Sequence, residues 1–255
     1  MKKLILSGAV MVAASAFAIH GTLSTDSENL TGDIKWQSRG KQYVVSVKKG
    51  QTMVDMERKL DVVTRLDIPK PAGYDKAVQA VEAGQGTAAI PVLSKIVSDY
   101  RMLVWDKPAG RYLALAYLAA GNAQKAYEVC LPIISEDKAA GYTGDLAAAY
   151  WQALLKLGKR EQLESLLKKA ASCGDRQTSA AALVMRGDII VAASNDSPEE
   201  LRKALRDAYL RVYLMYQDAE CQRERTEAML KAADCLDKLG QKQRGENLRA
   251  QAKAI

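Results

Sequence analysis

Histidine is nearly absent from this chain of 255 residues, in which His20 is the single example. Hydrolases that pair serine or cysteine with a histidine base need that base in the folded body, and so do zinc sites of the H-E-x-x-H type. His20 lies near the start of the chain, where we expect a disordered terminus. The composition therefore predicts that the protein is not an enzyme and has no metal site. Catalysis by lysine, serine or carboxylates alone stays open as an alternative.

A phosphate-binding loop is also missing. The segment GQGTAA, residues 84–89, is rich in glycine and precedes a helical pattern, but it lacks the lysine and the spacing of such a loop. It predicts an ordinary turn, and we expect no cofactor.

Cysteine is scarce, and no C-x-x-C motif occurs among Cys130, Cys173, Cys221 and Cys235, which excludes the usual redox motif and the zinc knuckle. Cys221 and Cys235 fall in one predicted helix, which separates them by roughly 20 Å and puts them beyond disulfide reach. Cys130 and Cys235 lie in apolar faces, where thiols behave as small hydrophobes. We expect buried free thiols, with one or more bridges as the alternative.

Long apolar runs are confined to the first 18 residues. Lys2 and Lys3 precede an uncharged stretch that ends in Ala16-Phe17-Ala18, and this order is typical of a secretory signal peptide cleaved after Ala18. An uncleaved anchor is the alternative, although so short a stretch spans a bilayer poorly. We expect residues 1–18 to be a signal peptide and the mature protein to be periplasmic or secreted from a bacterium, with no transmembrane segment after cleavage.

Charge is moderately basic, with 37 Lys and Arg against 30 Asp and Glu, a formal net charge of +7. Removal of Lys2 and Lys3 lowers it to +5. Export argues against nucleic acid as a partner, whereas a basic excess suits anionic lipid or phosphorylated envelope polymer. Clusters at Arg202, Lys203 and Arg206, and at Arg223 and Arg225, are expected to face water, as charged groups on helices do by default.

Residues 19–69 have the period of strands. The runs LTGDIKWQS, KQYVVSVK, QTMVDM and VVTRLDI are rich in β-branched and aromatic residues, and the pairs Arg39-Gly40 and Lys49-Gly50 are hairpin signals. They predict an antiparallel module of four or five strands. Pro69, Pro71 and Gly73 then predict a boundary, after which residues 70–255 are helical.

Glycines divide the helical region at fixed intervals. Gly84, Gly121 and Gly158 follow one another at intervals of 37 residues, Asn195 lies a further 37 along, and Gly240 closes a pair 45 residues later. Each ends one apolar-periodic segment and precedes another, as in a solenoid whose helical hairpins bury their apolar faces by stacking. The fold class predicted is α+β, mainly α: a small antiparallel β-module followed by an α-solenoid of about five hairpins.

The segment LALAYLAAGNAQKAYEVC, residues 113–130, resembles a tetratricopeptide repeat (TPR), with Ala114, Tyr117, Gly121-Asn122 and Ala126 at the family's positions. LRDAYLRVYLMYQ and LKAADCLDKLGQKQRGENL resemble later repeats of exported bacterial TPR proteins, and the resemblance spans residues 72–255. The interval of 37 departs from the family's 34, Leu163 replaces an expected alanine, and an insertion near Ser197 leaves the register open after residue 190. The strand region resembles small SH3-like or Sm-like barrels.

The TPR resemblance implies a scaffold or adaptor that binds a protein or peptide of the cell envelope in the groove formed by the first helix of each hairpin. A homo-oligomer through the β-module is also possible on this pattern, because its strand edges need covering. A binder of anionic envelope polymer or lipid is the alternative function. The family register places eight residues in the groove: Tyr74, Val78, Arg111, Leu115, Leu118, Gln152, Leu155 and Lys156.

Overall fold

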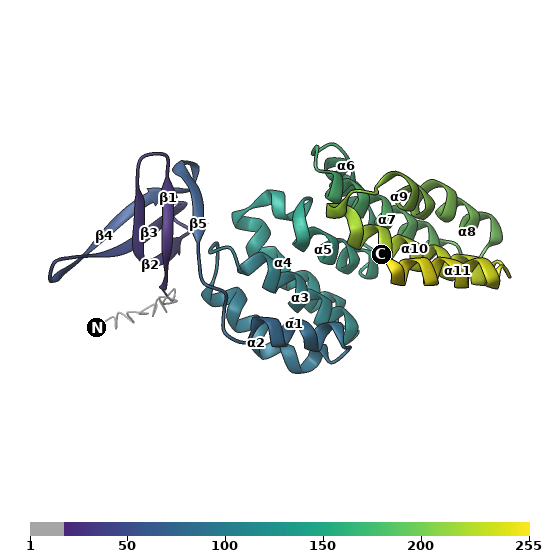
Figure 1. The fold of residues 1–255 in the computed structure, drawn as a ribbon, viewed down its shortest axis with the longest axis horizontal. Coiled ribbons are helices and arrows are strands. Elements are labelled where there is room, and N and C mark those ends of the chain that lie inside the picture. Colours follow the sequence, from purple (N-terminus) through teal and green to yellow (C-terminus); the bar gives the residue numbers. More distant parts are fainter. Residues whose placement is uncertain (1–17) are drawn as a thin grey trace, which may run out of the picture. The chain divides into compact units, whose positions relative to one another are not determined.

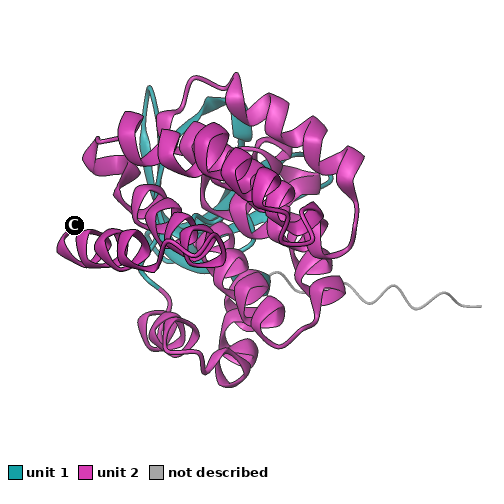
Figure 2. Cartoon of the chain, turned by 90° about the vertical axis from the view of Figure 1, so that its right-hand side faces the viewer, with its two compact units in different colours: residues 1–70, 98–104 teal, residues 71–97, 105–255 magenta. Residues whose placement is uncertain are grey.

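The computed structural model describes residues 18–255, and the predicted signal peptide falls outside the described residues except for Ala18. The described chain forms two compact units (Figure 2). The β unit comprises residues 18–70 together with residues 98–104, and the helical unit comprises residues 71–97 and 105–255. A small antiparallel sheet followed by stacked helical hairpins confirms the predicted fold class.

The β unit is a five-stranded antiparallel sheet of order β4-β3-β2-β1-β5 (Figure 1). The predicted hairpins are present, and a short 3-10 turn, η1, separates the last two strands. The edges of the sheet are β4 and β5. The predicted likeness to SH3-like or Sm-like barrels and the predicted oligomer stay predictions. The strands are β1 Ile19–Thr25, β2 Asn29–Gln37, β3 Gln42–Lys49, β4 Thr52–Lys59 and β5 Val63–Asp67, and η1 is Leu60–Val62.

One face of this sheet forms its core, as the alternation in the sequence predicts. Leu23, Ile34 and Val45 are fully buried, and Ile34 is paired with Val45 across β2 and β3. The rings of Trp36 and Tyr43 meet edge to face at a centroid distance of 4.9 Å.

His20 lies in β1, opposite Asp33 of β2, and its Nδ1 is 3.1 Å from the Asp33 carboxylate. The expectation of a disordered segment at His20 is therefore wrong. The residue belongs to a paired strand on the exposed side of the sheet.

Residues 98–104 leave the first helical hairpin and complete the β unit. The Tyr43 hydroxyl donates a hydrogen bond of 2.9 Å to the carbonyl of Met102, and Leu103 is only 1% exposed. Met102 and Val104 both have positive φ, 58° and 75°, a conformation that is uncommon outside glycine and asparagine. The sequence gives no hint that this loop supplies part of the core of the β-module.

The helical unit contains five hairpins. The first three and the last are simple helix pairs, whereas the second arm of the fourth is split into α8, a π-helical turn η3, and α9 (Figure 1). The pairs are α1 Tyr74–Glu82 with α2 Gly86–Asp99; α3 Asp106–Ala119 with α4 Ala123–Glu136; α5 Gly144–Lys156 with α6 Arg160–Ala171; α7 Arg176–Ala193 with α8 Pro198–Ala204, η3 Leu205–Tyr209 and α9 Leu210–Met215; and α10 Gln222–Lys238 with α11 Lys242–Ala254. The short turns η2 Lys138–Gly141 and η4 Ala219–Cys221 precede α5 and α10.

The turns between paired helices explain the glycine interval. Gly84, Gly121, Gly158 and Gly240 have φ between 68° and 77°, the left-handed conformation that ends a helix and that glycine adopts without strain. Asn195 takes the same place in the fourth hairpin with φ 47°. The predicted hairpin boundaries are confirmed at each of these five positions.

Small residues let the helices approach closely. A Cβ on Gly86 would lie 3.0 Å from the Cα of Ala116 across α2 and α3, and Ala114 and Ala126 are fully buried between α3, α4 and their neighbours. Among residues 18–255, no helix combines the length and the apolar character needed to cross a membrane.

Candidate functional site

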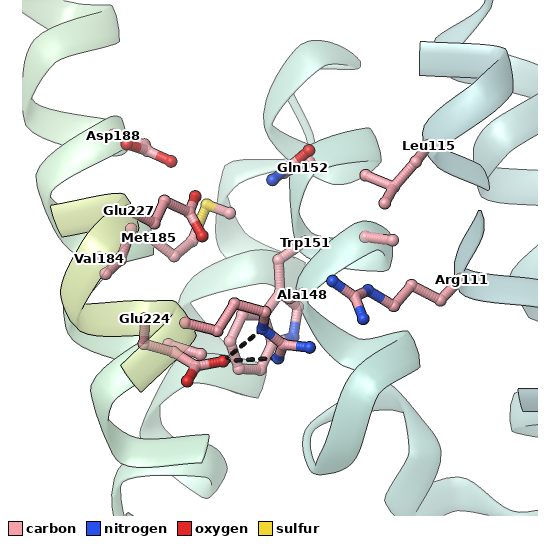
Figure 3. A pocket seen from close by; sticks show the side chains of 13 residues that line it. Arg111, Leu115, Ala148, Trp151, Gln152, Val184, Met185, Asp188, Glu224 and Glu227 are labelled. Atoms are coloured by element: carbon pink, nitrogen blue, oxygen red, sulfur yellow. Dashed lines mark hydrogen bonds and ion pairs between the residues drawn. The ribbon is translucent and has the colours of Figure 1, made fainter. Parts of the chain in front are cut away.

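A cavity of about 150 Å³ lies in the helical unit and is lined by residues of α3, α5, α7 and α10. We call it the charged cavity. In Figure 3, Arg111 and Leu115 enter from one side, Val184, Met185, Glu224 and Glu227 from the other, and Trp151 and Gln152 lie between them. α3, α5, α7 and α10 are the first helices of their hairpins, which is where the repeat resemblance places a groove.

The floor of the charged cavity is fixed by Trp151 of α5. This side chain is buried, and its Nε1 donates a hydrogen bond of 3.0 Å to the carbonyl of Gly141 in η2. A buried ring held at one end by a hydrogen bond has little freedom. Trp151 therefore provides a rigid apolar surface, which Ala148, Leu115 and Met185 extend.

Two arginines on opposite sides of the cavity share one carboxylate. Oδ1 of Asp145, at the start of α5, lies 2.6 Å from Nη1 of Arg223 and 3.5 Å from Nη1 of Arg111. Arg223 also donates through Nε, at 2.8 Å, and Nη2 to Oε1 of its neighbour Glu224, the bonds drawn as dashed lines in Figure 3. Burial lowers the pKa of Arg223, but Asp145 and Glu224 raise it above its usual value overall.

The other end of the cavity is acidic. Nζ of Lys231 lies 2.5 Å from Oδ2 of Asp188 and 2.7 Å from Oε1 of Glu227. Burial raises the pKa of Asp188, although Lys231 and the Tyr209 hydroxyl, which donates at 2.8 Å, act in the opposite direction. The pKa of Lys231, which burial alone would lower, is raised by Glu227 and Asp188. One lysine thus serves two carboxylates that line the cavity.

Three of the eight predicted groove residues meet in the charged cavity. Arg111 and Leu115 of α3 and Gln152 of α5 all line it. They come from the second and third hairpins.

The other five lie outside the lining of this cavity. Tyr74 is buried in an aromatic cluster, 5.2 Å from the ring of Trp105 and 6.4 Å from that of Tyr112, and burial raises its pKa to about 12. Leu118 and Leu155 pack against the main core of the helical unit. Val78 is half-buried in α1, and Lys156 is exposed at the end of α5.

The contribution of α10 to the cavity was not predictable from the sequence pattern. Arg223, expected on a water-facing surface, lines the cavity beside Glu224 and Glu227, so that expectation is wrong for Arg223. Met185 was predictable as a lining residue, because positions 37 and 74 residues after Arg111 are Ala148 and Met185. The interval of 45 before Gly240 shifts α10 out of this register, and for that reason the same extrapolation fails there.

A group of possible metal ligands lies apart from the cavity, where donor atoms of Asp218, Glu220 and Cys221 fall within 4.8 Å of one another. Asp218 is engaged by Arg176 at 2.7 Å, and burial raises the pKa of the Cys221 thiol. A metal needs the thiolate form of cysteine. These observations give no support for a metal site at η4.

No protein-family model matches the chain, and no curated protein matches it. Among solved structures, the chain is similar to two crystal structures of nearly identical TPR-like repeats from a putative kinesin light chain of Podosopora anserina, one of which carries a glutamine-to-methionine substitution. Each similarity has a TM-score of 0.42 and 17% identity, and covers 72% of this chain and 92% of that chain. The chain's own helix pairs and glycine turns establish the hairpin repeat.

Proposed function

We propose that the protein is an exported scaffold or adaptor of the bacterial envelope that binds a protein or peptide partner in the charged cavity and along the first helices on either side of it. The observation that carries the proposal is the cavity itself, in which four successive hairpins contribute both apolar walls and charged groups. Peptide-binding grooves combine an apolar floor with a few polar anchors. The charged cavity has a volume of about 150 Å³, which is below the roughly 300–1,000 Å³ that is typical of small-molecule sites.

Site-specific photocrosslinking tests the scaffold proposal. A benzophenone amino acid at Gln152, which lines the cavity, should capture one partner reproducibly in cells. The same probe at Glu161, exposed on the second helix α6, should not. Equal capture from both positions, or none from Gln152, would contradict binding at the cavity.

Export is supported by the charge and apolar pattern of residues 1–18, and β1 begins at Ile19. Cleavage after Ala18 would leave every strand of the β unit intact. N-terminal sequencing of the mature protein should therefore begin at Ile19. A mature chain that retains Lys2 and Lys3 would refute export by this route.

The alternative partner, an anionic lipid or polymer, depends on the basic excess of the whole chain. The charged cavity does not share this excess, because its arginines are already paired with Asp145 and Glu224. Binding to vesicles that contain anionic lipid, with a steep loss as salt increases, would favour the alternative. Capture by the cavity should depend much less on salt.

A further inference from the structure

The charged cavity and the ion pairs that border it have more negative than positive groups. The positive groups are Arg111, Arg223 and Lys231, and the negative groups are Asp145, Asp188, Glu224 and Glu227. This local excess of carboxylates is opposite in sign to the net charge of +7 of the whole chain. A ligand that brings one positive charge would balance the groups around the cavity.

Glu224 provides an independent observation. Its side chain is 2% exposed and lines the cavity. Oε1 accepts hydrogen bonds from Arg223 and, at 3.4 Å, from Gln177, whereas Oε2 has no hydrogen-bond partner within residues 18–255. A buried carboxylate oxygen that accepts no hydrogen bond is strongly unfavourable, so Glu224, which lines the cavity, keeps one unsatisfied acceptor atom.

Along α10, a second carboxylate, that of Glu227, lies between Glu224 and solvent. Glu224 and Glu227 are three residues apart and therefore lie on the same face of the helix, about one turn from each other. Glu227 is 39% exposed. A positive group entering from solvent would meet Glu227 first and Glu224 deeper in the cavity.

The size and the walls of the cavity fit one long basic side chain. A cavity of about 150 Å³ accommodates a group the size of benzene, which is close to that of a guanidinium with part of its stem. Leu115 and Met185 offer apolar surface, on which the methylene stems of lysine and arginine pack while their charged ends reach polar groups.

From these observations, and on the basis of the function proposed above, we propose that the charged cavity binds an arginine or lysine side chain of the partner polypeptide, with Glu224 and Glu227 as its acceptors. The contrary arrangement, a partner carboxylate between Arg111 and Arg223, would have to displace Asp145, which already occupies that position. A carboxylate would also add negative charge to a cavity with an excess of it.

Peptide pools test this proposal on the full mature chain. Each pool contains nine-residue peptides with blocked ends, small and apolar residues at random on both sides, and one fixed central residue: arginine, lysine, glutamate or citrulline, which has the shape of arginine without its charge. The arginine or lysine pool should bind about tenfold more tightly than the citrulline and glutamate pools. Free spermidine serves as a separate probe for cations that are not polypeptides.

Two neutral substitutions locate the effect. Glu227→Gln changes a half-exposed side chain and should reduce the preference for the basic pools about fivefold while the protein stays folded, and Glu224→Gln should remove the preference. Glu246→Gln, on the exposed face of α11, is the matched control and should leave the preference unchanged. Because Lys231 keeps its ion pair with Asp188 when Glu227 is neutralised, Glu227→Gln should fold and decides the matter even if Glu224→Gln fails to fold.

The outcomes separate this inference from the scaffold proposal. Equal binding of all four pools that is lost on Leu115→Glu would be consistent with the scaffold proposal. It would contradict the proposal that the cavity binds a basic side chain. A preference for the glutamate pool would contradict the proposal and indicate that Arg111 and Arg223 bind a carboxylate of the partner. Tight binding of spermidine alone would show that the ligand is not a polypeptide. Failure of every pool to bind would also refute this inference, whereas the photocrosslink at Gln152 tests the scaffold by itself.

Discussion

The four cysteines are all free, but they differ in access to solvent. Cys130, Cys221 and Cys235 are buried, and burial raises the pKa of each thiol, to about 12 for Cys130 and about 11 for Cys235. Thiol reagents attack the thiolate. We expect a maleimide at neutral pH to label only the half-buried Cys173 in the native protein and all four cysteines in denaturant, as peptide mass spectrometry would show. Rapid native labelling of Cys130 would contradict this burial.

The raised pKa of Cys130 makes stability depend on alkaline pH. In the unfolded chain this thiol ionises near its usual value of 9.0, whereas in the folded chain it keeps its proton up to about 12. Above pH 9 the unfolded state binds fewer protons, so this contribution to stability is complete below pH 9 and is lost progressively as pH rises toward 12. The slope is about 1.4 kcal/mol per pH unit.

Urea unfolding at pH 8 and pH 10 measures this dependence. Cys130→Ala lowers stability at both values because it leaves a small cavity, but the loss between pH 8 and pH 10 should be smaller than in the unaltered protein. The same loss in both proteins would show that Cys130 does not titrate as described.

At the scale of the secondary-structure element, the π-helical turn η3 depends on a glycine in α7. A Cβ on Gly187 would lie 2.3 Å from Cε1 of Tyr209, whose ring is buried and whose hydroxyl is bound to Asp188. Gly187→Ala should therefore destabilise the protein by about 1–3 kcal/mol, although alanine favours a helix by about 1 kcal/mol over glycine. Chemical denaturation measures the change.

A double substitution controls for the helix propensity. In a Tyr209→Ala background the ring is absent, so Gly187→Ala should be neutral or slightly stabilising. If Gly187→Ala destabilises the unaltered protein and the Tyr209→Ala variant equally, contact with the Tyr209 ring is not the cause of the destabilisation.

The helices and their turns could be predicted because local patterns determine them. Left-handed turns at Gly84, Gly121 and Gly158 favour glycine, and their interval is visible in the sequence. The cavity was predictable only where that interval holds, at Arg111, Leu115 and Gln152. Charged residues of α10 look like ordinary solvent-facing residues, since only tertiary packing brings Arg223 of the last hairpin to Asp145 of the third.

At the scale of the whole molecule, the sequence boundary at Pro69 does not separate all contacts of the β unit. Residues 98–104 return to it after two helices, with Leu103 buried and Met102 bound to Tyr43. A repeat interval in the sequence predicts only how adjacent hairpins pack against each other. It cannot show that a loop between α2 and α3 packs with strands that precede both helices.

Fragments test the role of this loop. A fragment of residues 19–70 should be largely unfolded, whereas a fragment of residues 19–104 should fold, because only the longer one contains Leu103. Trp36 is the single tryptophan in both fragments, so its fluorescence and near-UV circular dichroism report on the β unit directly.

Leu103→Asp in the longer fragment is the matched variant and should behave like the short one, because it places a charge in the core. A folded fragment of residues 19–70 would show that the loop is dispensable for the β unit.

The returning loop also sets the order in which the parts of a new chain can be finished. Met102 follows Tyr43 by 59 residues, so a ribosome that adds about 5–20 residues per second makes it roughly 3–12 s later. Many small domains fold faster than this. The β unit, although its strands come first, is therefore completed only after α1 and α2 have been made, and until then its nascent strands expose the apolar surface that Leu103 later covers.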